Sequence, residues 1–293
     1  MLSSGGNITA LSVERDLVSV VVAESRGGRW HLTGGTELAG SLDPKDFDSL
    51  KRAVGKAIDG AGLSSTTEVA VSIGDHFANV GLFSFSDFPQ SEDDALAIVR
   101  LRAKKEFALS DTPVRLDYHV VDPGSPTVVL VVAIDEGVAT AIEEALGEKG
   151  IEVGRMGLTS FHLANMVLED KVSPGGNFSI ATIIDGTLTL MIFSGGRLDF
   201  YRSKSFKGGS DGLARDLRMS FVSYGGGARD ELAGGGEEDL MLFTGEIAPD
   251  EVKEIEGVKT TVIRVGDFLE LGGASSSNAS SDILRLAAIG ACL

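Results

Sequence analysis

Residues 180–202 read IATIIDGTLTLMIFSGGRLDFYR, and this stretch decides the fold class. Apolar, β-branched residues run up to Asp185-Gly186, continue beyond it, and resume after a second glycine turn at 194–196. An Asp-Gly pair between two apolar runs is a strong short-range signal for a tight hairpin. The stretch therefore predicts three consecutive antiparallel strands. Apolar residues at helical spacing within 213–221 predict a helix after them.

The N-terminal part of the chain has the same design. Apolar runs at 8–11, 17–22 and 29–32 predict a first strand meander. A helix with one apolar face follows, between Asp48 and a terminating Gly62. The two meanders share no visible sequence identity, so the repeat is one of topology. We expect two related α/β lobes.

A third unit is expected between the lobes. Its pattern of strand, helix, two strands, helix and strand predicts a small α/β subdomain inserted into the first lobe. The expected division is the first part of the first lobe at 1–75, the inserted subdomain at 76–152, a return to the first lobe with a linker helix at 153–176, and the second lobe at 177–293, with a small subdomain around 206–238.

Composition excludes several classes of protein. The 293 residues include 43 acidic and 26 basic ones, a formal net charge of −17. A nucleic-acid binder needs Lys and Arg for phosphate contacts, and an anionic membrane surface would repel such a chain. The single cysteine, Cys292, rules out an internal disulfide. Without a signal core or a long apolar run, we expect a soluble cytoplasmic protein.

Motifs for common chemistries are missing. The sequence has no P-loop, no complete dinucleotide-binding glycine motif and no nucleophile elbow. Its four histidines are His31, His76, His119 and His162, and their spacing does not predict a metal site. The charged run at 14–16 is interpreted as a solvated turn.

Several segments together carry a resemblance to a known family. They are 183–189, 196–202 and Phe206-Lys207-Gly208-Gly209 in the second lobe, 83–89, 103–107 and 116–118 in the inserted subdomain, and 286–291 at the end. By their order and spacing along the chain, these segments resemble the type IV pilus inner-membrane assembly protein PilM family over nearly the whole chain. That family is related to the cytoplasmic domain of GspL and to FtsA, within the actin-like ATPase superfamily. The resemblance implies actin-like, ribonuclease H-like duplicated lobes with an inserted small α/β subdomain.

The resemblance also implies a site for Mg-ATP between the lobes. The matching nucleotide-binding positions are Ser12, Asp185, Gly186, Thr187, Gly208, Gly209 and Gly245, with Asp185 near the metal if Mg-ATP binds. The family's first phosphate turn is Asp-x-Gly, whereas this chain has Leu11 to Asp16 without a glycine. The third turn keeps only Gly245. We therefore expect a degenerate nucleotide site, with no catalytic residues and no hydrolysis of ATP. Whether the protein is an enzyme stays an open question.

The functional expectation is an assembly platform of a type IV pilus or type II secretion machine. The resemblance implies a position at the cytoplasmic face of the inner membrane, held there through partners and without direct insertion. The partner implied is the N-terminal cytoplasmic tail of a PilN-like membrane protein, bound near the strands at 69–73 and 80–85. Pilus motor ATPases and a second copy of the chain are further partners. An ATP-binding switch, a polymerising actin-like ATPase and a sugar-kinase-like enzyme are the alternatives.

Overall fold

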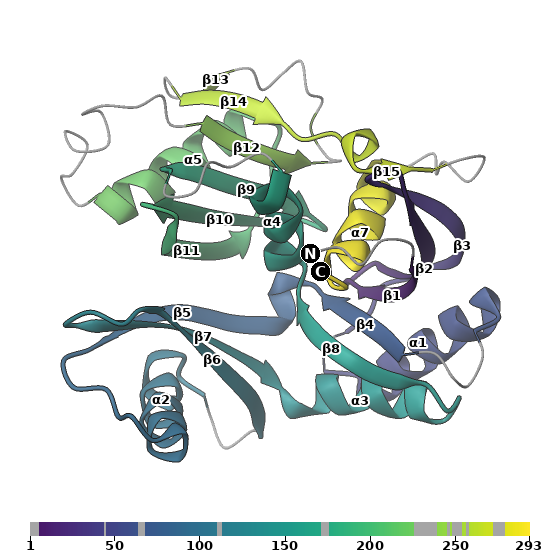
Figure 1. The fold of residues 1–293 in the computed structure, drawn as a ribbon, viewed down its shortest axis with the longest axis horizontal. Helices are drawn as coiled ribbons and strands as arrows, with labels where there is room; N and C mark the ends of the chain where they lie inside the picture. The colour runs from purple at the N-terminus through teal and green to yellow at the C-terminus, as the bar shows by residue number, and fades with distance from the viewer. Residues whose placement is uncertain are drawn as a thin grey trace.

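The computed structural model describes residues 6–43, 45–63, 68–109, 113–170, 176–225, 239–244, 247, 254–255, 258–271 and 279–293. Their strands form two six-stranded sheets and one three-stranded sheet (Figure 1). None of the helices in these ranges is long and apolar enough to cross a membrane.

The first sheet has the order β15-β3-β2-β1-β4-β8. Strands β1, β2 and β3 are an antiparallel meander, and β4 then returns parallel to β1. Helix α1 covers one face, and it ends at Gly62, whose φ of 63° is the left-handed conformation that glycine adopts easily. The bounds are β1 Asn7–Val13, β2 Leu17–Arg26, β3 Arg29–Ala39, α1 Phe47–Ala61, β4 Glu68–Ile73, β8 Glu152–Leu158 and β15 Leu269–Glu270.

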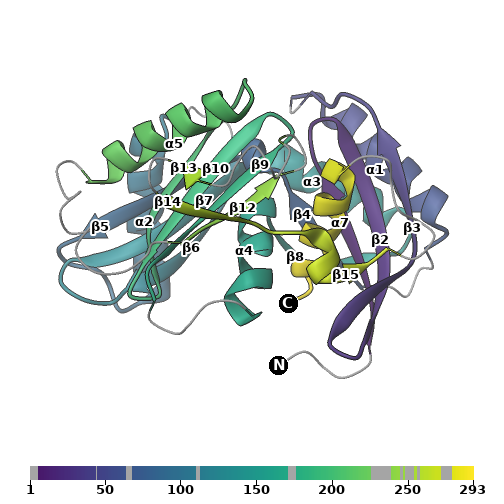
Figure 2. The same cartoon turned by 90° about the horizontal axis from the view of Figure 1, so that it is seen from above.

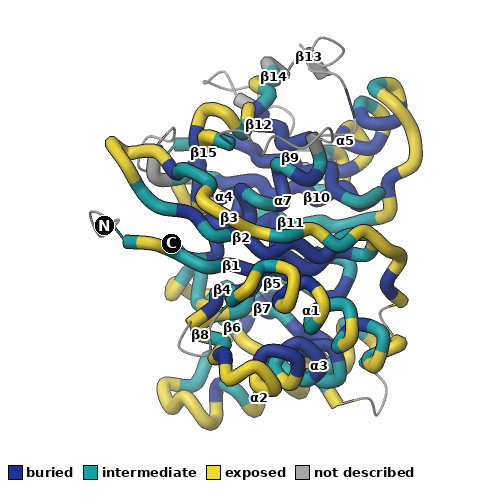
Figure 3. The backbone as a smooth tube through the Cα atoms, turned by 90° about the vertical axis from the view of Figure 1, so that its right-hand side faces the viewer, coloured by how far each residue is buried: buried dark blue, intermediate teal, exposed yellow. Residues whose placement is uncertain are grey.

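The second sheet repeats this plan in the order β11-β10-β9-β12-β14-β13. Strands β9, β10 and β11 are the second antiparallel meander, and β12 returns parallel to β9. Strands β9 and β10 are buried along nearly their whole length (Figure 3). The topological repeat is therefore confirmed. The bounds are β9 Phe178–Ile184, β10 Thr187–Ser194, β11 Arg197–Ser205, α5 Ser210–Gly225, β12 Asp239–Thr244, β13 Glu254–Ile255 and β14 Val258–Val262.

The hairpin expected at Asp185-Gly186 is confirmed. Ile184 pairs with Thr187, so the loop contains only these two residues. Both have positive φ, 52° for Asp185 and 65° for Gly186. Type I′ hairpin turns need this conformation at both central positions, and Asp and Gly tolerate it best. The local sequence thus fixes the turn that carries Asp185 to the lobe junction.

The three-stranded sheet β5-β7-β6 is an antiparallel insertion after β4, covered by α2. Helix α3, which the sequence analysis placed in the same unit, packs instead against α1 in the first-lobe core. Its apolar spacing predicts the helix but cannot say which neighbour will cover it. We therefore propose 78–135 as the inserted unit. The bounds are η1 Asp75–Phe77, β5 Ala78–Phe85, α2 Glu92–Glu106, β6 Val114–Asp122, β7 Thr127–Asp135 and α3 Glu136–Gly147.

The C-terminal segment does not stay with the second lobe. Strand β15 pairs with β3 of the first sheet, and helix α7 (Ala279–Gly290) shares a buried cluster with β1, β2 and α4 (Thr159–Asp170). Figure 2 shows α4 and α7 side by side between the two groups of strands. The second-lobe range expected at 177–293 thus ends with elements that complete the first lobe, because α7 covers the face of its sheet opposite α1.

Candidate functional site

The turns of the two strand meanders meet at the junction between the lobes. The Asp16 N–H, in the β1–β2 turn, donates a hydrogen bond to Asp185 Oδ2 in the β9–β10 turn at 3.3 Å. A second cross-lobe contact joins Arg197 of β11 to Asp122 of β6. Equivalent turns of the duplicated lobes are therefore in direct contact, and the site is built around them.

Glu14, at the start of the first turn, is a buried carboxylate with only 2% of its surface exposed. Its Oε1 accepts a hydrogen bond from Thr159 Oγ1 at 2.6 Å. Thr159 Oγ1 lies 3.1 Å from Ser72 Oγ, and Ser72 Oγ lies 3.0 Å from His162 Nδ1. A continuous series of buried side-chain hydrogen bonds therefore holds Glu14 in place. The interpretation of Glu14 as part of a solvated turn is wrong, although Asp16 is exposed.

Asp75 is a second buried carboxylate, and it connects the lobes. It accepts hydrogen bonds from the Ser160 hydroxyl and from the Ser160 N–H at 3.2 Å. The Tyr201 hydroxyl, on β11 of the second lobe, donates a further hydrogen bond to Asp75 Oδ1 at 2.6 Å. The Tyr201 ring stacks on Phe161 with 5.4 Å between ring centres. One carboxylate thus ties η1, α4 and β11 together.

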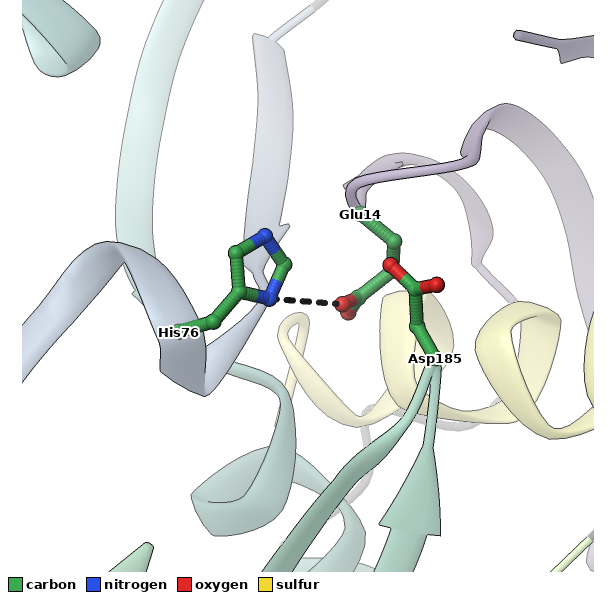
Figure 4. A group of neighbouring side chains, drawn as sticks. All are labelled: Glu14, His76 and Asp185. Carbon is green, nitrogen blue, oxygen red and sulfur yellow. Dashed lines mark ion pairs between the residues drawn. The ribbon is translucent and has the colours of Figure 1, made fainter. Parts of the chain in front are cut away.

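His76 lies next to Asp75 and faces Glu14 (Figure 4). Its Nδ1 is 3.8 Å from Glu14 Oε2, which is too long for a hydrogen bond. Among the described residues neither ring nitrogen has a hydrogen-bond partner. Gly74 makes this approach possible, because a Cβ there would lie 2.2 Å from Glu14 Oε2. Burial, and then the charge of Arg15, lower the pKa of His76 to about 4, so the ring is neutral near pH 7.

Burial raises the pKa of three carboxyl groups in the site, those of Glu14, Asp75 and Asp185. The pKa of Glu14 is raised by burial, and the hydrogen bond from Thr159 offsets part of this rise. Burial also raises the pKa of Asp75, and the hydrogen bonds that this carboxylate accepts offset part of the rise. Burial and the neighbouring Asp16 carboxyl raise the pKa of Asp185 to about 6. The junction is therefore a place where negative charge is costly unless a cation accompanies it.

The structure brings together part of the set of residues expected to bind nucleotide. Asp185, Gly186 and Thr187 form the second turn, and the Gly186 carbonyl accepts a hydrogen bond from the Phe206 N–H at 2.8 Å. This bond places the turn beside Gly208 and Gly209, which precede α5. Ser12 is buried within β1, and its hydroxyl has no hydrogen-bond partner among the described residues. Gly245 lies outside the described residues.

The two described turns do not fit the triphosphate of Mg-ATP. A phosphate cradle presents free backbone N–H groups, usually from a glycine-containing turn. Here the Asp16 N–H is bonded to Asp185, and Glu14 and Asp16 bring carboxyl groups into the first turn. Arg15 is the basic residue that offsets them. The site favours a cation over a polyphosphate, so we derive no step through the nucleotide.

Comparison with solved structures identifies the architecture. The chain superposes on a chain of the PilM-PilN type IV pilus biogenesis complex with a TM-score of 0.66 and 14% identity, covering 97% of this chain and 96% of that one. A Bacteroides thetaiotaomicron protein of unknown function, described as having an actin-like ATPase fold, gives a TM-score of 0.57 and 11% identity over 95% of both chains. The chain has an actin-like ATPase fold.

A third similar structure comes from a type II secretion system. The cytoplasmic domain of EpsL, an inner membrane component of the type II secretion system of Vibrio cholerae, gives a TM-score of 0.52 and 11% identity, covering 97% of this chain and 95% of that one. No family model and no curated protein matches the chain in sequence. The actin-like fold expected from the sequence resemblance is therefore confirmed by structure alone.

The sequence analysis missed Asp75 and His76 as members of the site. Both lie in η1, directly after the end of β4, where a chain leaving a central strand arrives at the lobe junction. Gly74-Asp75-His76 after a buried strand was the available signal, because small and polar residues often follow a strand at such an edge. The Asp75 partners Ser160 and Tyr201 are 85 and 126 residues away, so spacing could not show the contacts.

Proposed function

We propose that the protein is an assembly platform of a type IV pilus or type II secretion machine, located at the inner membrane through its partners. It binds the N-terminal cytoplasmic tail of a bitopic, PilN-like membrane protein, and this binding does not depend on nucleotide. The observation that carries the proposal is the likeness to the PilM-PilN complex over nearly the whole chain, inserted sheet included. The contact between the Asp16 N–H and Asp185, where phosphate would lie, supports independence from nucleotide.

The strand edge that would receive the tail is β8, not β4. The sequence analysis implicated residues 69–73 and 80–85. Strand β4, which holds the first of these, is paired with β1 on one side and β8 on the other, and β5, which holds the second, is paired with β7 and contacts β11 of the second lobe. Strand β8 ends the first sheet, and Figure 1 shows the inserted sheet to its left. An extended peptide adds to a free edge through main-chain hydrogen bonds, and alternate side chains give specificity.

The charge near β8 suits a basic tail. Glu68 and Glu152 are neighbours in the parallel register of β4 and β8, and both are exposed. Arg155, on the same strand, is basic and acts against the binding of a basic tail. The net charge of −17 adds a long-range attraction for a positively charged segment close to the membrane.

Hydrogen exchange tests this proposal. The probe is a synthetic peptide of the N-terminal cytoplasmic tail of a PilN-like membrane protein. On peptide binding we expect slower amide exchange in residues 152–158, because strand addition protects the edge N–H groups. Strand β6, one of the two edge strands of the inserted sheet, is the internal control and should not change. No binding, or protection that spares 152–158, contradicts the proposal.

A charge variant adds a second readout. Glu152→Lys is expected to weaken peptide binding about two- to fivefold, because exposed charge pairs contribute little each. Glu92→Lys, on the exposed start of α2, makes the same charge change away from β8 and should leave the affinity unchanged.

A further inference from the structure

We propose that Glu14, His76 and Asp185 form a binding site for one divalent transition-metal ion, and that this ion joins the two lobes. Each residue offers one ligand atom, and these atoms lie within 4.8 Å of one another. Ligand atoms bound at about 2.0–2.3 Å to one ion lie roughly 3–4 Å apart. Only a small inward movement of the side chains would therefore complete the site. The proposal is independent of tail binding at β8.

The unpartnered imidazole is the observation that points to a ligand. The His76 side chain is only 7% exposed, and within the described part of the chain both of its nitrogens lack hydrogen-bond partners. A buried polar group without a partner is destabilising and uncommon, so each case needs an explanation. Figure 4 shows the ring directed toward Glu14, with Asp185 reaching the same point from the other lobe. A metal ion there would satisfy one of the two ring nitrogens and neutralise both carboxylates.

The surroundings of Glu14 are those of a positioned ligand. Thr159 donates to Oε1, so Oε2 remains on the side of His76. Hydrogen bonds of this kind orient ligands in metal sites and matter for affinity. Gly74 supplies the space, since any side chain there would occupy the position between Glu14 and His76.

The donor set favours zinc-like ions over magnesium. One imidazole nitrogen with two carboxylates suits Zn²⁺ and its first-row neighbours, whereas Mg²⁺ prefers oxygen ligands and keeps its waters. Three protein ligands leave a position for water, as in open zinc sites. Arg15 is the group that opposes a cation, because its charge acts on all three ligands. The test must therefore decide whether Arg15 alone or a metal ion neutralises the carboxylates of the site.

The experiment is a calorimetric titration of the full chain with ZnCl₂ after removal of metal with EDTA. We expect one ion per chain and a loss of affinity of at least about tenfold in His76→Ala and in Glu14→Gln. His31→Ala is the matched control, because His31 Nδ1 also faces a carboxylate, that of Glu270, at 3.2 Å on the surface. Its affinity for Zn²⁺ should equal that of the wild type.

A second measurement keeps the test valid if a variant fails to fold. In the wild-type chain, Zn²⁺ should shift the imidazole nitrogen resonances of one histidine, and that signal should be absent in His76→Gln. The proposal is overturned if Zn²⁺ does not bind at micromolar concentration, or if His76→Ala and Glu14→Gln leave the affinity unchanged. Loss of binding in His31→Ala overturns it as well, and so does Mg²⁺ binding as tight as Zn²⁺ binding.

Discussion

Asp75→Ala is expected to lower the free energy of unfolding by about 3–5 kcal/mol. The substitution leaves the hydroxyl groups of Tyr201 and Ser160 and the Ser160 N–H without their acceptor in a buried place. Each unsatisfied buried donor costs about 1–3 kcal/mol. Because Tyr201 belongs to the second lobe, the loss should also weaken the junction. Urea unfolding followed by circular dichroism measures the change.

Two further variants make this result specific. Asp117→Ala removes an exposed aspartate of β6 whose one hydrogen bond among the described residues is from the adjacent Tyr118 N–H, and we expect a change within about 0.5 kcal/mol. Tyr201→Phe removes the cross-lobe donor alone. In a double-mutant cycle, Asp75→Ala and Tyr201→Phe should be non-additive, since each breaks the same hydrogen bond. Additive effects, or an Asp75→Ala protein as stable as the wild type, would contradict the described contact.

Gly290→Ala is the second large effect, with an expected loss of stability of about 1–3 kcal/mol. Gly290 is the last residue of α7, where this helix crosses α4. A Cβ at this position would lie 2.4 Å from the backbone oxygen of His162. A backbone atom cannot rotate away as a side chain can, so the two helices would have to separate.

Gly55→Ala is the matched control for that helix contact. Gly55 lies inside α1, and a Cβ there would meet nothing within 4 Å. Helix propensity alone favours alanine over glycine by about 0.5–1 kcal/mol, so Gly55→Ala should raise stability. Opposite signs for the two substitutions are expected in chemical denaturation. A stabilised Gly290→Ala protein would show that α4 and α7 are not in close contact.

Local features of the fold were predictable from the sequence. The Asp185-Gly186 turn follows from the backbone preferences of two residues, and helix α1 follows from apolar spacing and Gly62. The repeated meander could be seen because each copy is a run of neighbouring strands. The placement of α3 and α7 could not, since an apolar helix face does not specify which of several sheets or helices covers it.

The candidate site was less predictable for a physical reason. Whether a charged turn is solvated depends on what lies opposite, and the buried Glu14 is hydrogen-bonded by Thr159, 145 residues away. Asp75 and Tyr201 likewise meet only when both lobes are assembled. Asp185 was found because its turn has a local signature. His76 has only its place after a buried strand as a signal, and its role depends on neighbours from other elements.

The central claim is a tail-binding platform that works without nucleotide, and one calorimetric measurement tests it. The tail peptide is titrated into the chain in the absence and in the presence of millimolar Mg-ATP. We predict binding with the same dissociation constant in both conditions, because the first turn offers carboxylates where phosphate needs N–H donors. Binding of the peptide only when Mg-ATP is present would contradict the account and favour a nucleotide-driven switch.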